Sequence, residues 1–146
     1  MNQFAVFHSI ESAYSFALTK NRIVLRIRVD KNDDISHCYL IYNDKHTFFL
    51  KRNEKELVRK HEDDLYAYYE IELLLKKSSI AYIFRFVSEG KDYYYSSDGL
   101  KENYQMATSY YNFFQMAFIN ETDIQKEVSW SKEAIIYEIF VDRFYR

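Results

Sequence analysis

Apolar and polar residues alternate in several short stretches of this chain, which is the pattern of β-strands with one face in a core and the other in water. The clearest example is residues 23–29. Its inward face consists of Ile23, Leu25, Ile27 and Val29. Arg26 and Arg28 occupy the opposite face. This stretch therefore predicts a half-buried strand.

The same alternation predicts further strands along the chain. They lie at residues 4–8, 13–18, 37–42, 65–75, 80–87 and 92–96. The spacing of these strands predicts two hairpins, at residues 13–29 and 80–96. Asn21 in the first turn and Gly90 in the second can each take the positive φ that a tight turn needs. The tyrosines and phenylalanines of residues 110–114 favour a final strand.

The segments between these strands are polar. Residues 30–34 combine three aspartates with Asn32, and we interpret them as a solvated turn because they lack the glycine and distant glutamate of a calcium loop. Residues 43–64 predict a long connection, with one short strand at residues 47–51. Residues 54–61 are expected to form a helical turn or to stay mobile. Residues 120–129 predict a linker.

Short strands separated by turns predict an all-β fold, an immunoglobulin-like β-sandwich, over residues 1–123. Residues 124–146 would then hold the linker and one additional strand. The composition agrees, since 15 Tyr and 12 Phe suit strands. Because the chain has 2 Gly and no Pro, Asn and Asp are expected to form most of its turns.

Charge and cysteine content narrow the possible functions. A net charge of −2 with mixed signs gives no field that attracts nucleic acid or an anionic membrane. The single Cys38 excludes an internal disulfide and is typical of a small core residue. No secretory leader and no run long enough to span a bilayer is present. These features predict a cytoplasmic protein.

No pattern in the sequence predicts catalysis, a metal or a cofactor. The four histidines (His8, His37, His46 and His61) are too scattered to suggest a metal site. No nucleophile elbow and no glycine loop occurs. The paired carboxylates Asp63 and Asp64 fit a turn.

Binding is the remaining possibility, because sugar rings stack on flat aromatic faces. The exposed candidates are Tyr66, Tyr68, Tyr93, Tyr95, Phe48 and Phe49. The alternative is that these aromatics are core residues or cross-strand pairs.

The end of the chain differs from the rest. Residues 134–141 are almost continuously apolar, which predicts a strand buried on both faces, as in a parallel sheet. Nothing after Arg146 supplies the second face, so we expect the chain to be cut after the first strand of a larger domain. Such a strand exposes a pairing edge. It should be disordered, folded back on the sandwich, or swapped into a neighbour.

This region resembles the segment that opens the catalytic barrel of the α-amylase superfamily. The resemblance rests on Trp130, on the run Ala134-Ile135-Ile136-Tyr137-Glu138-Ile139-Phe140, and on Asp142-Arg143-Phe144. Val141 replaces the usual Pro and Glu138 the usual Gln. The preceding residues are similar in layout to the N-terminal domain of the neopullulanase, cyclomaltodextrinase and maltogenic amylase branch.

The resemblance implies a non-catalytic accessory domain of an intracellular α-glucan hydrolase. The Asp, Glu and Asp that act in that family, and the calcium loop of many members, belong to segments beyond this chain, so the fragment should be inactive. The implied partners are the catalytic barrel, an α-glucan oligosaccharide and a second subunit of a homodimer. In the family, a loop after the third strand reaches the partner's cleft. Asp44 and His46 occupy the matching positions.

Three hypotheses follow. The chain is the accessory domain of such a hydrolase, or an autonomous α-glucan-binding module that uses exposed tyrosines, or a dimerisation and cleft-shaping domain without sugar affinity.

Overall fold

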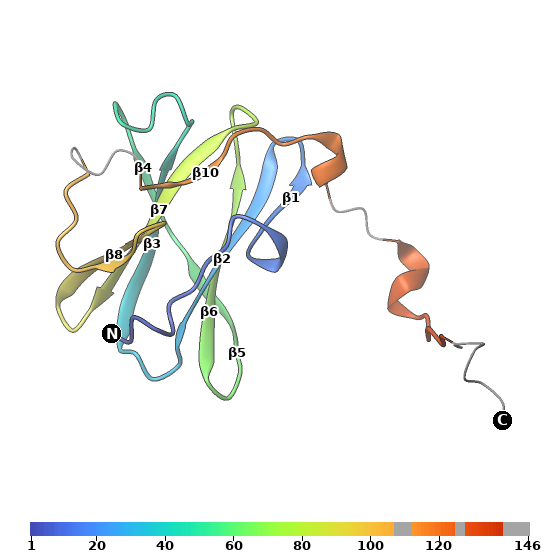
Figure 1. The fold of residues 1–146 in the computed structure, drawn as a ribbon, viewed down its shortest axis with the longest axis horizontal. Coiled ribbons are helices and arrows are strands. Elements are labelled where there is room, and N and C mark those ends of the chain that lie inside the picture. Colours follow the sequence, from blue (N-terminus) through green and yellow to red (C-terminus); the bar gives the residue numbers. More distant parts are fainter. Residues whose placement is uncertain (107–111, 125–127, 139–146) are drawn as a thin grey trace.

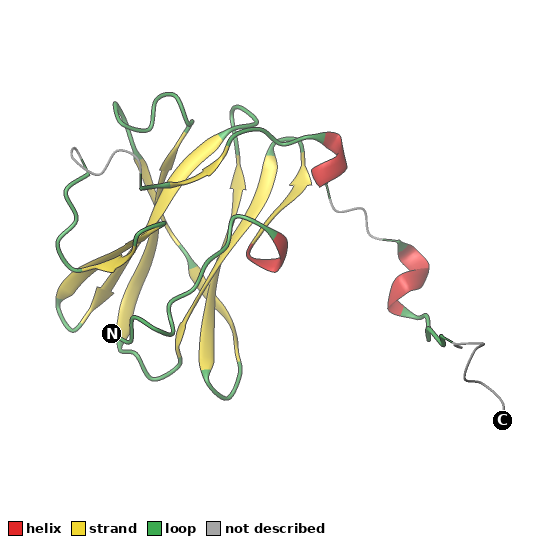
Figure 2. Ribbon diagram, in the orientation of Figure 1, coloured by secondary structure: helices red, strands yellow, loops and turns green. Residues whose placement is uncertain are grey.

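A computed structural model, which describes residues 1–106, 112–124 and 128–138, shows a sandwich of two antiparallel sheets (Figure 1). Sheet A has the strand order β1-β2-β6-β5. Sheet B has the order β4-β3-β7-β8-β9, and β10 also pairs with β7. The helical parts are short 3-10 turns at η1 (Ser12–Tyr14), η2 (Glu121–Asp123) and η3 (Ser129–Lys132) (Figure 2). The predicted all-β sandwich is confirmed.

The strands of sheet A are β1 (Ser15–Thr19), β2 (Arg22–Asp30), β6 (Tyr66–Leu74) and β5 (Val58–Glu62). The predicted alternation along β2 is confirmed, because its four apolar inward residues are buried. The β1–β2 turn differs from the prediction, since Asn21 does not take a positive φ. Instead, the Thr19 hydroxyl accepts a hydrogen bond from the backbone N–H of Arg22 at 3.0 Å.

The strands of sheet B are β4 (Asn53–Glu56), β3 (Ile35–Asn43), β7 (Ile80–Ser88), β8 (Lys91–Ser96), β9 (Gly99–Lys101) and β10 (Phe114–Met116). β3 covers one edge of β7 along its whole length. Two strands share the other edge of β7. β8 pairs with the residues of β7 from Phe84 onward, and β10 pairs with the first three residues of β7. β7 is therefore the central strand of this sheet.

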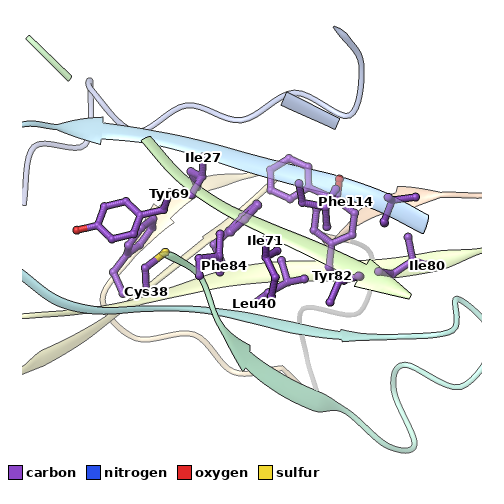
Figure 3. Packing of buried hydrophobic residues seen from close by; sticks show 14 of the residues in the cluster. Ile27, Cys38, Leu40, Tyr69, Ile71, Ile80, Tyr82, Phe84 and Phe114 are labelled. Atoms are coloured by element: carbon purple, nitrogen blue, oxygen red, sulfur yellow. The ribbon is translucent and has the colours of Figure 1, made fainter. Parts of the chain in front are cut away.

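The main core lies between the two sheets. Figure 3 shows residues of sheet A beside residues of sheet B in this core, among them Ile27, Tyr69 and Ile71 from sheet A and Cys38, Leu40, Tyr82 and Phe84 from sheet B. Cys38 is a free thiol, and burial raises its pKa well above its usual value. Its predicted role as a core residue is confirmed.

A second, smaller core covers the outer face of sheet B. It joins Ile41, Ala81 and Ile83 on the strands to Phe48 and Phe113 from two loops. The rings of Phe48 and Phe113 lie 4.3 Å apart between centroids. As a result, residues on both faces of β7 are buried.

Two predictions about the long polar connection are wrong. Residues 47–51 form a turn, in which the N–H groups of Leu50 and Lys51 donate to the Thr47 carbonyl at 3.0 Å. Residues 54–61 are not helical but contribute to β4 and β5, the edge strands of the two sheets. All residues of both strands are exposed, so the alternation that reveals half-buried strands is missing.

The first and last strands predicted for the sandwich also differ from the structure. Residues 4–8 provide a single antiparallel bridge, from Phe7 to Arg28. β10 begins at Phe114, later than predicted, and residues 110–111 lie outside the described residues.

The predicted C-terminal strand is absent from its described part. Residues 134–138 form no strand and do not pack on the sandwich. Ile135 and Ile136 are 96% and 85% exposed. The rest of the predicted strand, residues 139–141, lies outside the described residues.

A buried histidine fixes the N-terminal segment to the core. The ring of His8 lies among Tyr82, Phe84 and Phe114. Its Nδ1 is 2.7 Å from the carbonyl oxygen of Arg26, and its Nε2 is 2.9 Å from the hydroxyl of Tyr82. Because a carbonyl can only accept, Nδ1 carries the proton and Nε2 accepts from Tyr82. Burial lowers the pKa of His8 from 6.5 to about 4.

This pKa predicts acid sensitivity of the fold. Between pH 6.5 and about pH 4, the unfolded chain protonates His8 and the folded chain does not. The free energy of unfolding should therefore fall as the pH is lowered through this range, by about 3 kcal/mol in total. Urea unfolding at a series of pH values measures the slope.

A His8→Gln variant tests the origin of that slope, because Gln does not titrate. We expect the slope to become shallower in His8→Gln and to be unchanged in His46→Gln, whose side chain is exposed. Equal slopes in all three proteins would contradict the assignment to His8.

The β7–β8 turn gives a second stability prediction. Both turn residues have positive φ, 52° at Glu89 and 74° at Gly90, which confirms the predicted role of Gly90. A Cβ at position 90 would touch nothing within 4 Å, so only backbone strain opposes a side chain there. Gly90→Ala should reduce stability by about 1–2 kcal/mol. Glu89→Asn should raise it by about 0.5–1 kcal/mol, since Asn tolerates this conformation.

Thermal unfolding of both variants checks these opposite signs. A stabilised Gly90→Ala protein would show that the turn does not require this conformation.

Candidate functional site

Three of the six aromatic candidates are directed into cores. Phe48 is 1% exposed and belongs to the small core on sheet B, so its predicted exposure is wrong. Tyr93 and Tyr95 on β8 lie opposite Phe86 and Phe84, and all four residues share the inward face. Both tyrosines are half-buried and pack against the main core rather than standing in solvent. A stacking surface on β8 is therefore not available at these positions.

Phe49 remains at the surface, with 45% of its area exposed, on the turn that follows β3. It lies on sheet B's side of the sandwich, whereas Tyr66 and Tyr68 are on β6 in sheet A. The structure therefore does not bring the six candidates together.

Tyr66 and Tyr68 both lie on the outer face of sheet A and are half-buried. The hydroxyl of Tyr68 donates to Oδ2 of Asp63 at 2.7 Å, and this bond raises the pKa of Tyr68 to about 12. Oδ1 of Asp63 accepts from the backbone N–H groups of Leu65 and Tyr66 at 2.9 and 2.7 Å. These three hydrogen bonds, that from Tyr68 first, lower the pKa of Asp63. The β5–β6 turn is thereby held by one carboxylate.

An arginine is held against the ring of Tyr66. The guanidinium carbon of Arg28 lies 4.1 Å from the Tyr66 centroid and 5.2 Å from that of Phe7. Such cation–π contacts fix the orientation of the rings. Arg28 and Phe7 were not among the predicted site residues. The predicted outward position of Arg28 in the strand at residues 23–29 was the available signal.

A pocket of about 250 Å³ adjoins Tyr66, and we call it the Tyr66 pocket. It is lined by Asn2, Phe4, Ala5, Asp30, Asn32, Asp64, Leu65 and Tyr66. Three segments meet there: the N-terminal residues, the β2–β3 turn and the β5–β6 turn. Arg28, whose guanidinium lies over the Tyr66 ring, does not line the pocket itself.

The segments that line the Tyr66 pocket are the N-terminal residues and the β2–β3 and β5–β6 turns, and they lie at the end of the sandwich opposite to the departing C-terminal segment (Figure 1). The pocket is at the Asp30 end of β2. Near the other end of β2, Lys20 forms an ion pair with Glu121 at 2.6 Å, and Ala17 bridges to Ile124. The two ends thus offer separate surfaces.

Asp44 and His46, the candidate partner contacts, are on the loop after β3. Oδ2 of Asp44 accepts from the Ser79 hydroxyl at 2.9 Å, and Oδ1 accepts from the His46 backbone N–H at 3.0 Å. Desolvation of the Asp44 carboxylate raises its pKa. The two hydrogen bonds and the positive charge of Lys77 have the larger combined effect, so the pKa of Asp44 is lowered. The carboxylate is therefore bound within its own chain, whereas the His46 side chain is exposed.

Asp44 also lines a pocket of about 400 Å³ between the ends of β3 and β6. Its lining is mixed, with Leu74 and Leu75 beside Lys51, Lys76 and Lys77. Among the described residues, no group of three or more His, Cys, Asp or Glu side chains could hold a metal ion. No helix in the described ranges is long and apolar enough to cross a membrane.

Known proteins resemble this chain over nearly its whole length. It is 32% identical over 143 residues to a cyclomaltodextrinase of Thermoanaerobacter pseudethanolicus, which covers 96% of this chain and 24% of the relative. It is 26% identical to neopullulanase 2 of Thermoactinomyces vulgaris, with 96% and 23% covered. An intracellular maltogenic amylase of Bacillus subtilis is 22% identical, with 99% and 25% covered.

Solved structures show the same fold. A cyclomaltodextrinase structure superposes with a TM-score of 0.79 at 23% identity, over 94% of this chain and 23% of the other. A maltogenic amylase from S. marinus gives a TM-score of 0.57 at 17% identity, over 77% of this chain and 14% of the other. This chain spans about a quarter of the length of its curated relatives. Residues 1–120 match the model of the α-amylase N-terminal immunoglobulin-like domain, and the chain belongs to that family.

Proposed function

We propose that this chain serves as a non-catalytic accessory domain of an α-glucan hydrolase, where it helps to form the active-site cleft or the dimer interface. One observation carries the proposal: the chain matches enzymes named cyclomaltodextrinase and neopullulanase over 96% of its own length but about a quarter of theirs. The substrate of the parent would be a cyclic or linear α-glucan. Residues 1–123 would be the accessory domain and residues 124–146 the passage into the barrel.

The surface at the C-terminal end of the sandwich supports this role. A groove of about 310 Å³ runs beside β1, an edge strand of sheet A, and Ile10, Phe16 and Phe118 contribute to its lining. Ile10 and Phe118 are 45% and 61% exposed. Apolar patches of this kind mark surfaces that a partner covers. The catalytic barrel, which would follow the linker, is the partner that fits this position.

A cytoplasmic location is part of the proposal. The free thiol of Cys38 suits a reducing compartment, and one relative is named an intracellular enzyme.

A chimera tests the accessory role. This chain would replace the matching quarter of the Thermoanaerobacter cyclomaltodextrinase, and hydrolysis of cyclomaltodextrin would be measured. We expect the chimera to remain active and the enzyme that lacks its N-terminal quarter to lose activity. Phe118→Ser in the chimera should lower activity or thermal stability, since it removes an apolar contact with the barrel worth about 1–3 kcal/mol.

Val58→Ser is the matched control, because Val58 is 59% exposed but lies on β5, at the opposite edge of sheet A from β1. It should leave the chimera unaffected. Equal effects of the two substitutions, or no activity in the chimera, would count against the docking of a barrel at the β1 groove. The isolated chain should release no reducing sugar from α-glucans.

A second candidate function is binding of α-glucan by the domain itself. Tyr66 and Tyr68 favour it, since they share the outer face of sheet A, where Arg28 stacks on Tyr66. Aromatic rings that are held in place bind sugar faces at low entropic cost.

Titration with maltotriose, followed by amide chemical shifts, tests this second function. We expect saturable shifts at Tyr66 with a millimolar Kd, and their loss in Tyr66→Ala. Tyr94→Ala is the control, because Tyr94 is also half-buried but belongs to sheet B. The absence of any shift at millimolar maltotriose would rule out binding by the isolated chain.

A further inference from the structure

We infer that the Tyr66 pocket is a binding site for one ring of a neutral α-glucan and that the N-terminal residues Asn2 and Phe4 form one of its walls. This inference rests on the second candidate function and locates it. Neither Asn2 nor Phe4 was among the predicted site residues.

The wall is formed by apolar side chains that the fold holds in solvent. Phe4 is 88% exposed and Leu65 is 66% exposed, and both line the pocket together with Tyr66. The next residues after Phe4 are fixed, since Ala5 and Val6 are 4% and 5% exposed. Phe4 therefore has an anchored neighbour on its C-terminal side. A large apolar residue kept in solvent by buried neighbours indicates an interaction surface.

Asn2 anchors the N-terminal side of Phe4. Its Nδ2 donates to Oδ2 of Asp30 at 2.8 Å, and its backbone N–H donates to Oδ1 of Asp33 at 2.9 Å. Its own Oδ1 accepts from the Phe4 backbone N–H at 3.2 Å, and its carbonyl accepts from the Ala5 N–H at 3.1 Å. Chain ends usually fray unless they are tied down. These bonds tie residues 2–5 into a turn that presents Phe4 beside the pocket.

Four residues with short planar polar side chains also line the pocket, and they are Asn2, Asp30, Asn32 and Asp64. Asp30 also accepts from the backbone N–H of Asn32 at 3.0 Å, and its hydrogen bonds lower its pKa, so it stays ionised at neutral pH. Carboxylates and amides together offer acceptors and donors to hydroxyl groups. Aromatic rings beside such groups match a sugar, which has apolar C–H faces and a hydroxyl rim.

Charge and size narrow the class of ligand. Among the described residues that line the pocket, two are acidic and none is basic, so a phosphate or a nucleic acid would be repelled. The volume of about 250 Å³ lies below the range of drug-sized ligands and suits a single ring of a longer chain. A glucan can extend from the pocket because the site is at the surface, away from the C-terminal end of the sandwich.

Phe4→Ala and Asn2→Ala test the wall in maltotriose titrations of the full chain. We expect saturable shifts at residues 2–5, Asn32 and Leu65, and about a tenfold weaker affinity in Phe4→Ala, from the loss of one aromatic contact. Asn2→Ala should also weaken binding, since it frees the turn that holds Phe4. Leu50→Ala, 75% exposed on another loop, is the control and should bind as the unaltered chain does.

Phe4→Ala should not change the unfolding temperature, because its side chain is exposed, whereas Asn2→Ala removes two hydrogen bonds of the N-terminal turn and should lower it slightly. If maltotriose binds and Tyr66→Ala abolishes it while Phe4→Ala and Asn2→Ala do not, the inference is overturned and the second candidate function stands. No binding to the unaltered chain overturns both. Preferential binding of a basic peptide at these residues would overturn the assignment to a neutral sugar.

Discussion

The burial of both faces of β7 is the constraint on which the rest of the sandwich depends. Tyr82, Phe84 and Phe86 point into the main core, whereas Ala81 and Ile83 point out of sheet B. A strand with apolar residues on both faces is stable only if something covers each face. Sheet A covers one, and Phe48 and Phe113 from two loops cover the other. The long connection after β3 therefore has a packing role, although its sequence is mostly polar.

The same requirement explains why the N-terminal residues belong to the fold. His8 fills the space above Tyr82, Phe84 and Phe114, and both of its ring nitrogens are hydrogen-bonded. A buried imidazole is tolerated only when its polar atoms have partners. Because His8 and Asn2 fix this segment at two points, Phe4 between them has a defined position. The Tyr66 pocket is thus a consequence of how the core is closed.

The sequence predicted the strands that bury one face and missed those that bury none. β2, β6 and β7 carry alternating or continuous apolar residues, which are signals of burial. β4 and β5 are exposed throughout and are specified by pairing with β3 and β6, which no local pattern reveals. The residues around Tyr66 also show that contacts between distant parts of the chain cannot be predicted from local patterns. Tyr66 and Tyr68 were identified from their residue type. Arg28 lies beside them because of the register between β2 and β6, and Asn2 and Phe4 join the pocket at Tyr66 because long-range hydrogen bonds hold the N-terminal residues. Whether Tyr93 and Tyr95 face inward also depends on the register of β8 against β7.

The two ends of the sandwich differ in chemistry, and this difference bears on how the proposed roles relate. The groove beside β1 is bordered by exposed Ile10 and Phe118 and lies near the departing chain, so covering it requires a protein surface. The Tyr66 pocket is lined by aromatic and acidic residues and lies at the far end, where a flexible polymer can reach it. A contact at one end does not occlude the other. The accessory role and glucan binding are therefore compatible in one domain, and a substitution at either end should alter one role without the other, since no residue lines both surfaces in the described part of the chain.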